Sequence, residues 1–358
     1  MERGPLSARR WILLPLMIAE TSAGAGPSSP AAAQAVADAT GAALQADAGR
    51  ALSVLRAVQA SAFKGLDKDF RDCLERRFGV KTWRPPPSAL SDDFARRTLA
   101  AYQAYWHAAL LQPDTRRKAE ASLLAELRRL LHRDDIADMD ALEPLLAGQL
   151  RHSGYYSLQG LTGPLRELML WSAQETREMR VELPEGTHTT KVVVLDDFSS
   201  LGWSDFATCG RRGTGGWATT DALFAVRPRY ANIDGEEFLV TFLGHETQHF
   251  ADYARFPGLV QWQLEFRAKL TELALASETR ARVLRKLTED QGDNPESAHA
   301  YANKRVLAAL RERLGLPAGT PLDAVAVPTL QAAAVEELRA DSRRRTESAG
   351  KQPARPVL

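Results

Sequence analysis

The sequence predicts a mostly α-helical α+β protein, and two kinds of pattern lead to this prediction. Apolar residues recur at three- and four-residue spacing over residues 95–111, 116–131 and 161–179, which is typical of amphipathic helices. Two short apolar runs, 191–195 and 222–226, instead have the length and composition of strands. We therefore expect a helical N-terminal region, a small antiparallel sheet packed on a helical hairpin, and a helical C-terminal region.

Changes in composition divide the chain of 358 residues into five segments. A chain of this length is expected to hold one to three domains. The last residues are basic and contain prolines, which favours a frayed tail over a packed element. The predicted segments are a signal peptide at 1–25, an Ala-rich linker or first helix at 26–50, a helical domain at 51–180, a second domain at 181–345 and a disordered tail at 346–358.

The N-terminal segment has the pattern of a secretory signal peptide. Arg9 and Arg10 precede the short apolar stretch 11–19, and an Ala-Gly-Ala sequence at 23–25 resembles a cleavage site. The apolar stretch is too short for a stable membrane span. We expect a periplasmic or secreted location in a bacterium-like cell, with the cytoplasm as the alternative.

Charge and cysteine content narrow the class of function. The net charge is +1, which predicts no strongly basic face and argues against nucleic acid as a partner. The two cysteines, Cys73 and Cys209, are not spaced as metal ligands. They form either one disulfide in an oxidising compartment or two unrelated thiols. The sequence does not determine the oligomeric state.

Residues 245–249 spell H-E-x-x-H in a run that is expected to be helical. Histidines four residues apart lie on one helix face, so the imidazoles of His245 and His249 can reach one metal ion. Glu246 can then act on a water molecule at that ion. The preceding residues 237–243 supply apolar positions at helical spacing, as a helix packed against the protein body requires. The alternative is an amphipathic surface helix with two incidental histidines.

A catalytic zinc ion has three protein ligands and one open position, so a third ligand is needed. The acidic candidates are Asp252, Glu265 and Glu272. Asp252 would have to fold back over its own helical turn. An antiparallel helical hairpin about the Pro-Gly pair at 257–258 places Glu265 opposite His249, whereas Glu272 lies about 10 Å further along the helix. We choose Glu265 as the third ligand. Glu272 either orients a ligand histidine or is a solvated helix residue.

His245, Glu246, His249 and Glu265 resemble the active-site residues of the gluzincin zinc metallopeptidases, of which thermolysin is the familiar member. The motif is also similar to that of uncharacterised bacterial H-E-x-x-H proteins. The resemblance covers roughly residues 190–275. It implies one Zn²⁺ held by the two histidines and Glu265, with Glu246 as the catalytic general base. It also implies that the second domain is a metallopeptidase domain with a peptide or protein substrate.

The sequence departs from the gluzincin pattern in two places. The spacing from His249 to Glu265 is shorter than in thermolysin, and Lys269 stands where the family often has an acidic residue. In the family, a downstream histidine or tyrosine stabilises the oxyanion, and His299 and Tyr301 are the catalytic candidates for this role. The alternatives are that Tyr301 packs within its helix and that His299 lies at the surface.

An edge strand just upstream of the zinc helix pairs with the extended substrate in gluzincins. The resemblance implies that Gly216, Trp217 and Ala218 form this substrate-binding strand, and a plain hairpin with a Gly-rich turn is the alternative. The predicted function is therefore a zinc-dependent hydrolase, most specifically a metallopeptidase. A zinc-binding protein without turnover, acting as a binding or regulatory module, is the first alternative, and a helical scaffold with an accidental motif is the second. An intact Glu246 favours the enzyme.

Overall fold

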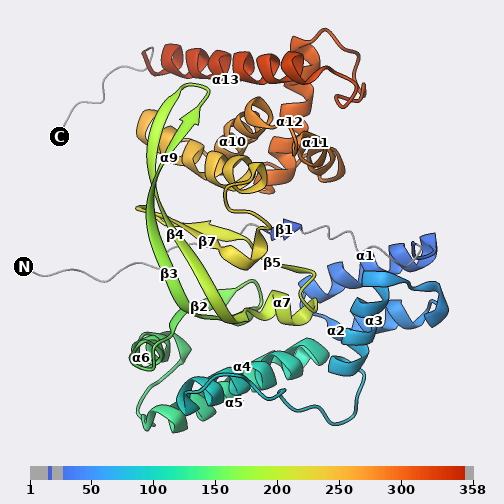
Figure 1. Ribbon diagram of the computed structural model, residues 1–358, viewed down its shortest axis with the longest axis vertical. Coiled ribbons are helices and arrows are strands. Elements are labelled where there is room, and N and C mark those ends of the chain that lie inside the picture. Colours follow the sequence, from blue (N-terminus) through green and yellow to red (C-terminus); the bar gives the residue numbers. More distant parts are fainter. Residues whose placement is uncertain (1–14, 18–26, 351–358) are drawn as a thin grey trace, which may run out of the picture. The chain divides into compact units, whose positions relative to one another are not determined.

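The computed structural model describes residues 15–17 and 27–350 and confirms a mostly helical α+β fold. Two compact units make up the described chain (Figure 1). The first unit contains residues 15–17, 27–175 and 194–217, and the second contains 176–193 and 218–350. Within the described ranges, no helix is long and apolar enough to cross a membrane.

The first unit is built largely from amphipathic helices with polar side-chain caps. Ser29 caps the helix that begins at Pro30 by accepting a hydrogen bond from the backbone of Ala32, and Asp92 and Asp138 cap the helices that begin at the residues after them in the same way. Segment 26–50 therefore contains the first helix and the first residues of the second. The helices are α1 (Pro30–Leu44), α2 (Ala48–Arg56), α3 (Gly65–Phe78), α4 (Asp93–Leu111), α5 (Arg116–Leu131), α6 (Met139–His152) and α7 (Trp203–Ala207).

A disulfide joins α3 to the residues that follow α7. Cys73 and Cys209 are bonded with an S–S distance of 2.03 Å, across 136 residues of sequence. The two cysteines are therefore one disulfide and not two separate thiols. Both belong to the first unit, so the bond connects sequence-distant parts of one compact body.

Residues 161–179 form strands, so the prediction of a helix there was wrong. β2 (Tyr156–Thr162) and β3 (Leu165–Leu183) form an antiparallel hairpin in which Thr162 pairs with Leu165. Gly163, with φ of 58°, supplies the left-handed conformation that the tight turn needs. Residues 168–171 are all buried and the following positions mostly alternate in exposure. A short apolar run of this kind has no periodicity that separates a buried strand from a helix.

A five-stranded mixed sheet contains β2, β3, β4 (Gly186–Leu201), β7 (Leu223–Val226) and β6 (Gly216–Ala218), in this order. An antiparallel sheet was expected. The predicted runs 191–195 and 222–226 correspond to β4 (Gly186–Leu201) and β7 (Leu223–Val226). Parts of β3 and β4 belong to each unit, so the predicted domain boundary near residue 180 falls inside β3.

Two further strands are short. Pro15–Met17 form β1, which pairs antiparallel with β5 (Arg212–Thr214). The rest of the predicted signal peptide, at 1–14 and 18–25, lies outside the described residues.

The second unit continues from the sheet into a series of helices (Figure 1). The last helix reaches Gly350, so the predicted tail from residue 346 begins inside a helix, and 351–358 lie outside the described part. The elements are α8 (Glu236–Phe238), the π-helix η4 (Leu239–Gly244), α9 (His245–Arg255), α10 (Gln261–Leu275), α11 (Arg280–Glu289), α12 (Ala298–Arg313) and α13 (Val327–Gly350).

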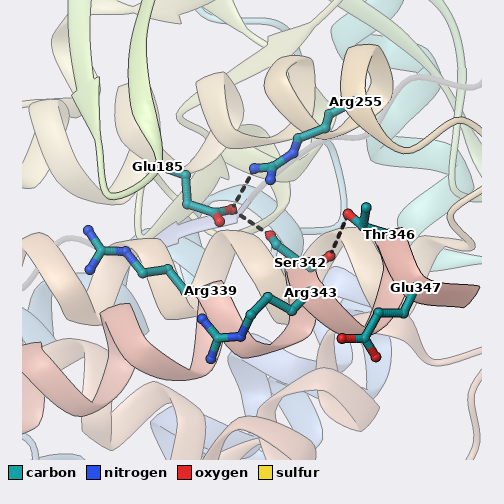
Figure 2. A pocket seen from close by; sticks show the side chains of 7 residues that line it. All are labelled: Glu185, Arg255, Arg339, Ser342, Arg343, Thr346 and Glu347. Carbon is teal, nitrogen blue, oxygen red and sulfur yellow. Dashed lines mark hydrogen bonds and ion pairs between the residues drawn. The ribbon is translucent and has the colours of Figure 1, made fainter.

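A buried arginine connects three helices and the β3–β4 turn of the second unit. The fully buried guanidinium of Arg267 on α10 lies 2.8 Å from Asp252 of α9 and 3.0 Å from Asp341 of α13. It also lies 2.9 Å from Glu185 on the turn, which accepts a hydrogen bond from Ser342 of α13 (Figure 2). These charges compensate one another, as buried ions require. The pocket of about 340 Å³ in Figure 2 opens beside this network and is lined by none of the predicted site residues.

Candidate metal centre

The H-E-x-x-H helix is preceded by a π-helical turn. η4 spans Leu239–Gly244 and α9 begins at the next residue, His245. The wide turn carries more residues than an α-helical turn and so changes which face of α9 points inward; such turns often occur at functional sites. A Cβ atom on Gly244 would come within 3.2 Å of the Leu239 carbonyl oxygen, so glycine suits this close approach. His245 and His249, which follow this turn on α9, are both buried.

The three predicted metal ligands converge in the second unit. The Nε2 atoms of His245 and His249 lie 3.1 Å apart. Glu265 Oε2 lies 3.6 Å from His245 Nε2, and Glu265 Oε1 lies 3.5 Å from His249 Nε2. α9 and α10 pack against each other and bring these residues together, as the predicted helical hairpin required. This group of side chains can bind one metal ion.

Buried polar atoms in this cluster are left without hydrogen bonds. Both carboxylate oxygens of Glu265 and Nδ1 of His249 have no hydrogen-bond partner among the described residues. The two facing Nε2 atoms can form a hydrogen bond only if one of them carries a proton. Unsatisfied buried polar groups are costly, and an ion at the centre of the three side chains would satisfy most of them. The residues present therefore fit a bound cation.

Glu272 orients one of the histidines. Its Oε1 atom lies 2.5 Å from His245 Nδ1, and its side chain is buried. An Nδ1–H that donates to this carboxylate leaves the Nε2 lone pair directed at the cluster, which is the tautomer that a metal ligand needs. Glu272 is thus not a solvated helix residue. It contacts His245 and is not itself one of the three ligands, which is one of the two alternatives from the sequence.

Asp252, the third acidic candidate, has another partner. Its Oδ1 atom lies 2.8 Å from Nε of Arg267 and also accepts a hydrogen bond from Gln248. It is not part of the His245, His249 and Glu265 cluster.

The surrounding imidazoles keep Glu265 ionised. Burial acts to raise the pKa of Glu265, but the imidazoles of His249, His299 and His245 outweigh it and hold that pKa well below its usual value. Lys269, which stands at the position where gluzincins often carry an acid, is buried with its Nζ atom 3.6 Å from Glu265 Oε2. Glu265 is therefore a carboxylate and available as a ligand oxygen.

Glu246 is buried close to two tyrosines. Burial raises the pKa of Tyr230 well above its usual value, and the negative charge of Glu246 adds to this effect. Partial burial likewise raises the pKa of Tyr253, and the charges of Glu246 and Glu265 contribute. The Glu246 carboxylate therefore lies within electrostatic range of both phenols, beside the metal-ligand cluster.

The two predicted oxyanion donors have different surroundings. His299, at the start of α12, is 40% exposed, and its Nδ1 atom lies 2.8 Å from Glu265 Oε2. The ring of Tyr301 instead packs edge-on against Trp262, with centroids 5.1 Å apart. The structure thus brings His299 to the cluster and shows Tyr301 in a packing contact.

The predicted substrate strand is an outer strand of the sheet. β6 spans Gly216–Ala218 and stands at one end of the strand order. The Trp217 side chain is buried and its ring lies 6.3 Å from that of Trp171. Gly216 and Trp217 belong to the first unit and Ala218 to the second. The role of this strand in substrate binding stays a prediction.

Sequence reasoning missed Tyr253 and Arg267. Tyr253 follows His249 by four residues, so helical spacing alone could have placed it on the ligand face of α9. Arg267 offered no such signal, because its partner Asp341 lies 74 residues away in the sequence. Comparison of the chain with known protein families, with curated proteins and with solved structures finds no match.

Proposed function

We propose that the protein is a zinc-dependent hydrolase, and specifically a metallopeptidase of the gluzincin type that acts on a peptide or protein substrate. The observation that carries this proposal is the convergence of His245, His249 and Glu265 between α9 and α10. Two imidazoles and one glutamate are the ligand set of thermolysin-like zinc sites. A tetrahedral zinc ion with bonds of about 2.0–2.1 Å would separate its ligand atoms by about 3.3–3.4 Å. The observed separations of 3.1, 3.5 and 3.6 Å are close to this value.

The proposed chemistry assigns a proton-transfer role to Glu246. Zinc, when bound, lowers the pKa of a coordinated water towards 7 and polarises the scissile carbonyl. The Glu246 carboxylate accepts a proton from the attacking water and afterwards delivers it to the leaving amine. As the water oxygen bonds to the carbonyl carbon, negative charge develops on the carbonyl oxygen and needs a donor. His245, fixed by Glu272, holds its Nε2 atom in place throughout.

Two measurements test this function. Metal analysis of the purified chain is expected to give one zinc per protein, and added zinc is expected to raise the thermal stability of metal-free protein. Absence of metal, together with no stabilisation by zinc, would contradict the metal site.

Peptide-library cleavage by the wild type and by Glu246→Gln then separates an enzyme from a zinc-binding module. Glu246→Gln is expected to bind zinc and to lose at least about 10²-fold in kcat, because it lacks the base. Glu289→Gln, an exposed change on α11, is the matched control and is expected to retain full activity. Equal background cleavage in all three proteins would favour a zinc-binding protein without turnover.

We further propose that the protein is exported. The Cys73–Cys209 disulfide supports this proposal, because disulfides persist in oxidising compartments such as the periplasm and the extracellular space. The signal-like pattern of the first 25 residues agrees with it. Fractionation of cells expressing the full chain, with immunodetection, tests the location, and recovery of the protein in the cytoplasm alone would contradict it.

A further inference from the structure

The proposed reaction needs a donor for the carbonyl oxygen, and α9 itself offers one. Tyr301 packs against Trp262, and the Nδ1 atom of His299 lies 2.8 Å from Oε2 of Glu265. Both candidates on α12 therefore already have a contact of their own. Tyr253 is the aromatic residue that shares a helix face with the ligands and is also open to solvent.

The position of Tyr253 follows from helical geometry. It lies four residues after His249 and seven after Glu246, and seven residues at 3.6 per turn amount to about two turns. Its side chain therefore projects from nearly the same side of α9 as Glu246. Side chains on a helix lean towards its N-terminus, which directs the phenol back over the turn that carries His249.

Exposure distinguishes Tyr253 from the proposed metal ligands and the proposed base. Its residue surface is 53% exposed, whereas His245, Glu246, His249 and Glu265 are all buried. Tyr253 is therefore a residue on the ligand face of α9 that a substrate from solvent can contact.

The electrostatic surroundings of Tyr253 agree with this placement on the ligand face of α9. Partial burial raises its pKa, and the carboxylates of Glu246 and Glu265 raise it further through their charges. The phenol therefore keeps its proton at neutral pH and remains a hydrogen-bond donor. Tyr230 also lies near Glu246, but it is buried against Phe238 with ring centroids 5.1 Å apart, so its ring is not open to substrate.

We propose that Tyr253 is a catalytic residue whose hydroxyl donates a hydrogen bond to the carbonyl oxygen of the scissile amide as that oxygen becomes negatively charged. The inference rests on the proposed hydrolase function. It places the oxyanion donor four residues beyond the second histidine of the motif, on the same helix, and not on the downstream helix α12. It also means that the donor and the general base Glu246 move as one rigid element.

The experiment compares Tyr253→Phe with Tyr155→Phe in the zinc-loaded full chain. Both changes remove one phenol hydroxyl, and Tyr155 is a partly buried residue packed on the core of the first unit. Zinc content and melting temperature are measured first and are expected to be unchanged in Tyr253→Phe, because the change removes one hydroxyl from a residue that is 53% exposed. For a cleaved peptide, we expect kcat to fall about 10²-fold in Tyr253→Phe with KM nearly constant, since the lost interaction acts in the transition state.

A second readout does not depend on turnover. A phosphinic peptide carries a tetrahedral, negatively charged group that imitates the developing oxyanion, and its Kd is measured for each zinc-loaded variant. We expect the Kd to rise at least about tenfold in Tyr253→Phe and to stay constant in Tyr155→Phe. Equal Kd values and equal kcat values in Tyr253→Phe and the wild type would overturn the assignment of Tyr253.

The outcomes separate this inference from the proposed function. A wild-type chain that binds no zinc, or that binds zinc but neither cleaves peptides nor binds the phosphinic peptide, overturns the hydrolase and the Tyr253 assignment together. A wild type that is active, with Tyr253→Phe equally active, overturns only the Tyr253 assignment and leaves Glu246 and the three ligands in their roles.

Discussion

Glu272 is the residue that most directly tests how His245 is oriented. Its carboxylate accepts from His245 Nδ1 at 2.5 Å, so its removal frees the ring to rotate and to change tautomer. We expect Glu272→Ala to weaken zinc binding about 10–100-fold, the usual cost of losing such a partner. Competition with a chelating dye measures this change.

The control for Glu272 is Glu289→Ala on α11, which removes an exposed glutamate and is expected to leave the zinc affinity unchanged. Circular dichroism of both variants shows whether the fold survives. A folded Glu272→Ala protein with wild-type zinc affinity would mean that His245 is held by the packing of α9 alone.

At the residue scale, the sequence predicted what depends on local spacing. His245 and His249 were predictable because four residues make one helical turn, and Glu265 was predictable because a short hairpin makes equidistant positions meet. The role of Asp252 was not predictable, since it depends on Arg267, which in turn needs Asp341 on a helix far along the chain. Charge partners that lie far apart in the sequence produce no periodic pattern by which they could be predicted.

At the scale of elements, the π-helix η4 determines how α9 enters the metal centre. Gly244 ends this turn, and a Cβ atom there would lie 3.2 Å from the Leu239 carbonyl oxygen and 3.6 Å from Leu275 Cδ1. We expect Gly244→Ala to lower the free energy of unfolding by about 1 kcal/mol or more, because the crowded atom is backbone and cannot rotate away. Because His245 follows directly, zinc affinity is expected to fall as well.

Gly148 provides the matched control for Gly244. It lies within the helix α6, and a Cβ atom there would meet no atom within 4 Å. Gly148→Ala is therefore expected to stabilise the protein by about 0.5–1 kcal/mol through the higher helix propensity of alanine. Urea unfolding of both variants measures the difference. Equal stabilisation by the two substitutions would show that η4 accommodates a side chain without strain.

The β2–β3 hairpin shows why some elements could not be predicted. Residues 168–171 are buried without alternation, and this run fits a helix and a buried strand equally well. The deciding feature is the turn at Gly163, where a positive φ reverses the chain between two paired strands. β3 and β4 contribute to both units, so the predicted boundary near residue 180 lies within a strand that the sequence did not reveal.

At the scale of the whole molecule, the two units contain different stabilising devices. The disulfide Cys73–Cys209 lies in the first unit, and the metal-ligand cluster lies in the second. Loop-closure entropy for a bond that spans 136 residues amounts to about 5 kcal/mol, and a bound metal ion stabilises the structure that holds its ligands. Each device is therefore expected to protect mainly its own unit against local opening.

Hydrogen exchange with mass spectrometry tests this separation. Chelation of the metal is expected to raise exchange in α9 and α10 and to leave α3 and α4 unchanged. Only the second unit contains the ligand side chains that lose their metal ion. Replacement of both cysteines by alanine is expected to raise exchange in α3 and α4 and to leave α9 and α10 unchanged. It removes the covalent link within the first unit and does not alter His245 or Glu265. Equal increases across both units after either treatment would show that they open as one cooperative body, and stability at the metal centre would then depend on the disulfide as well.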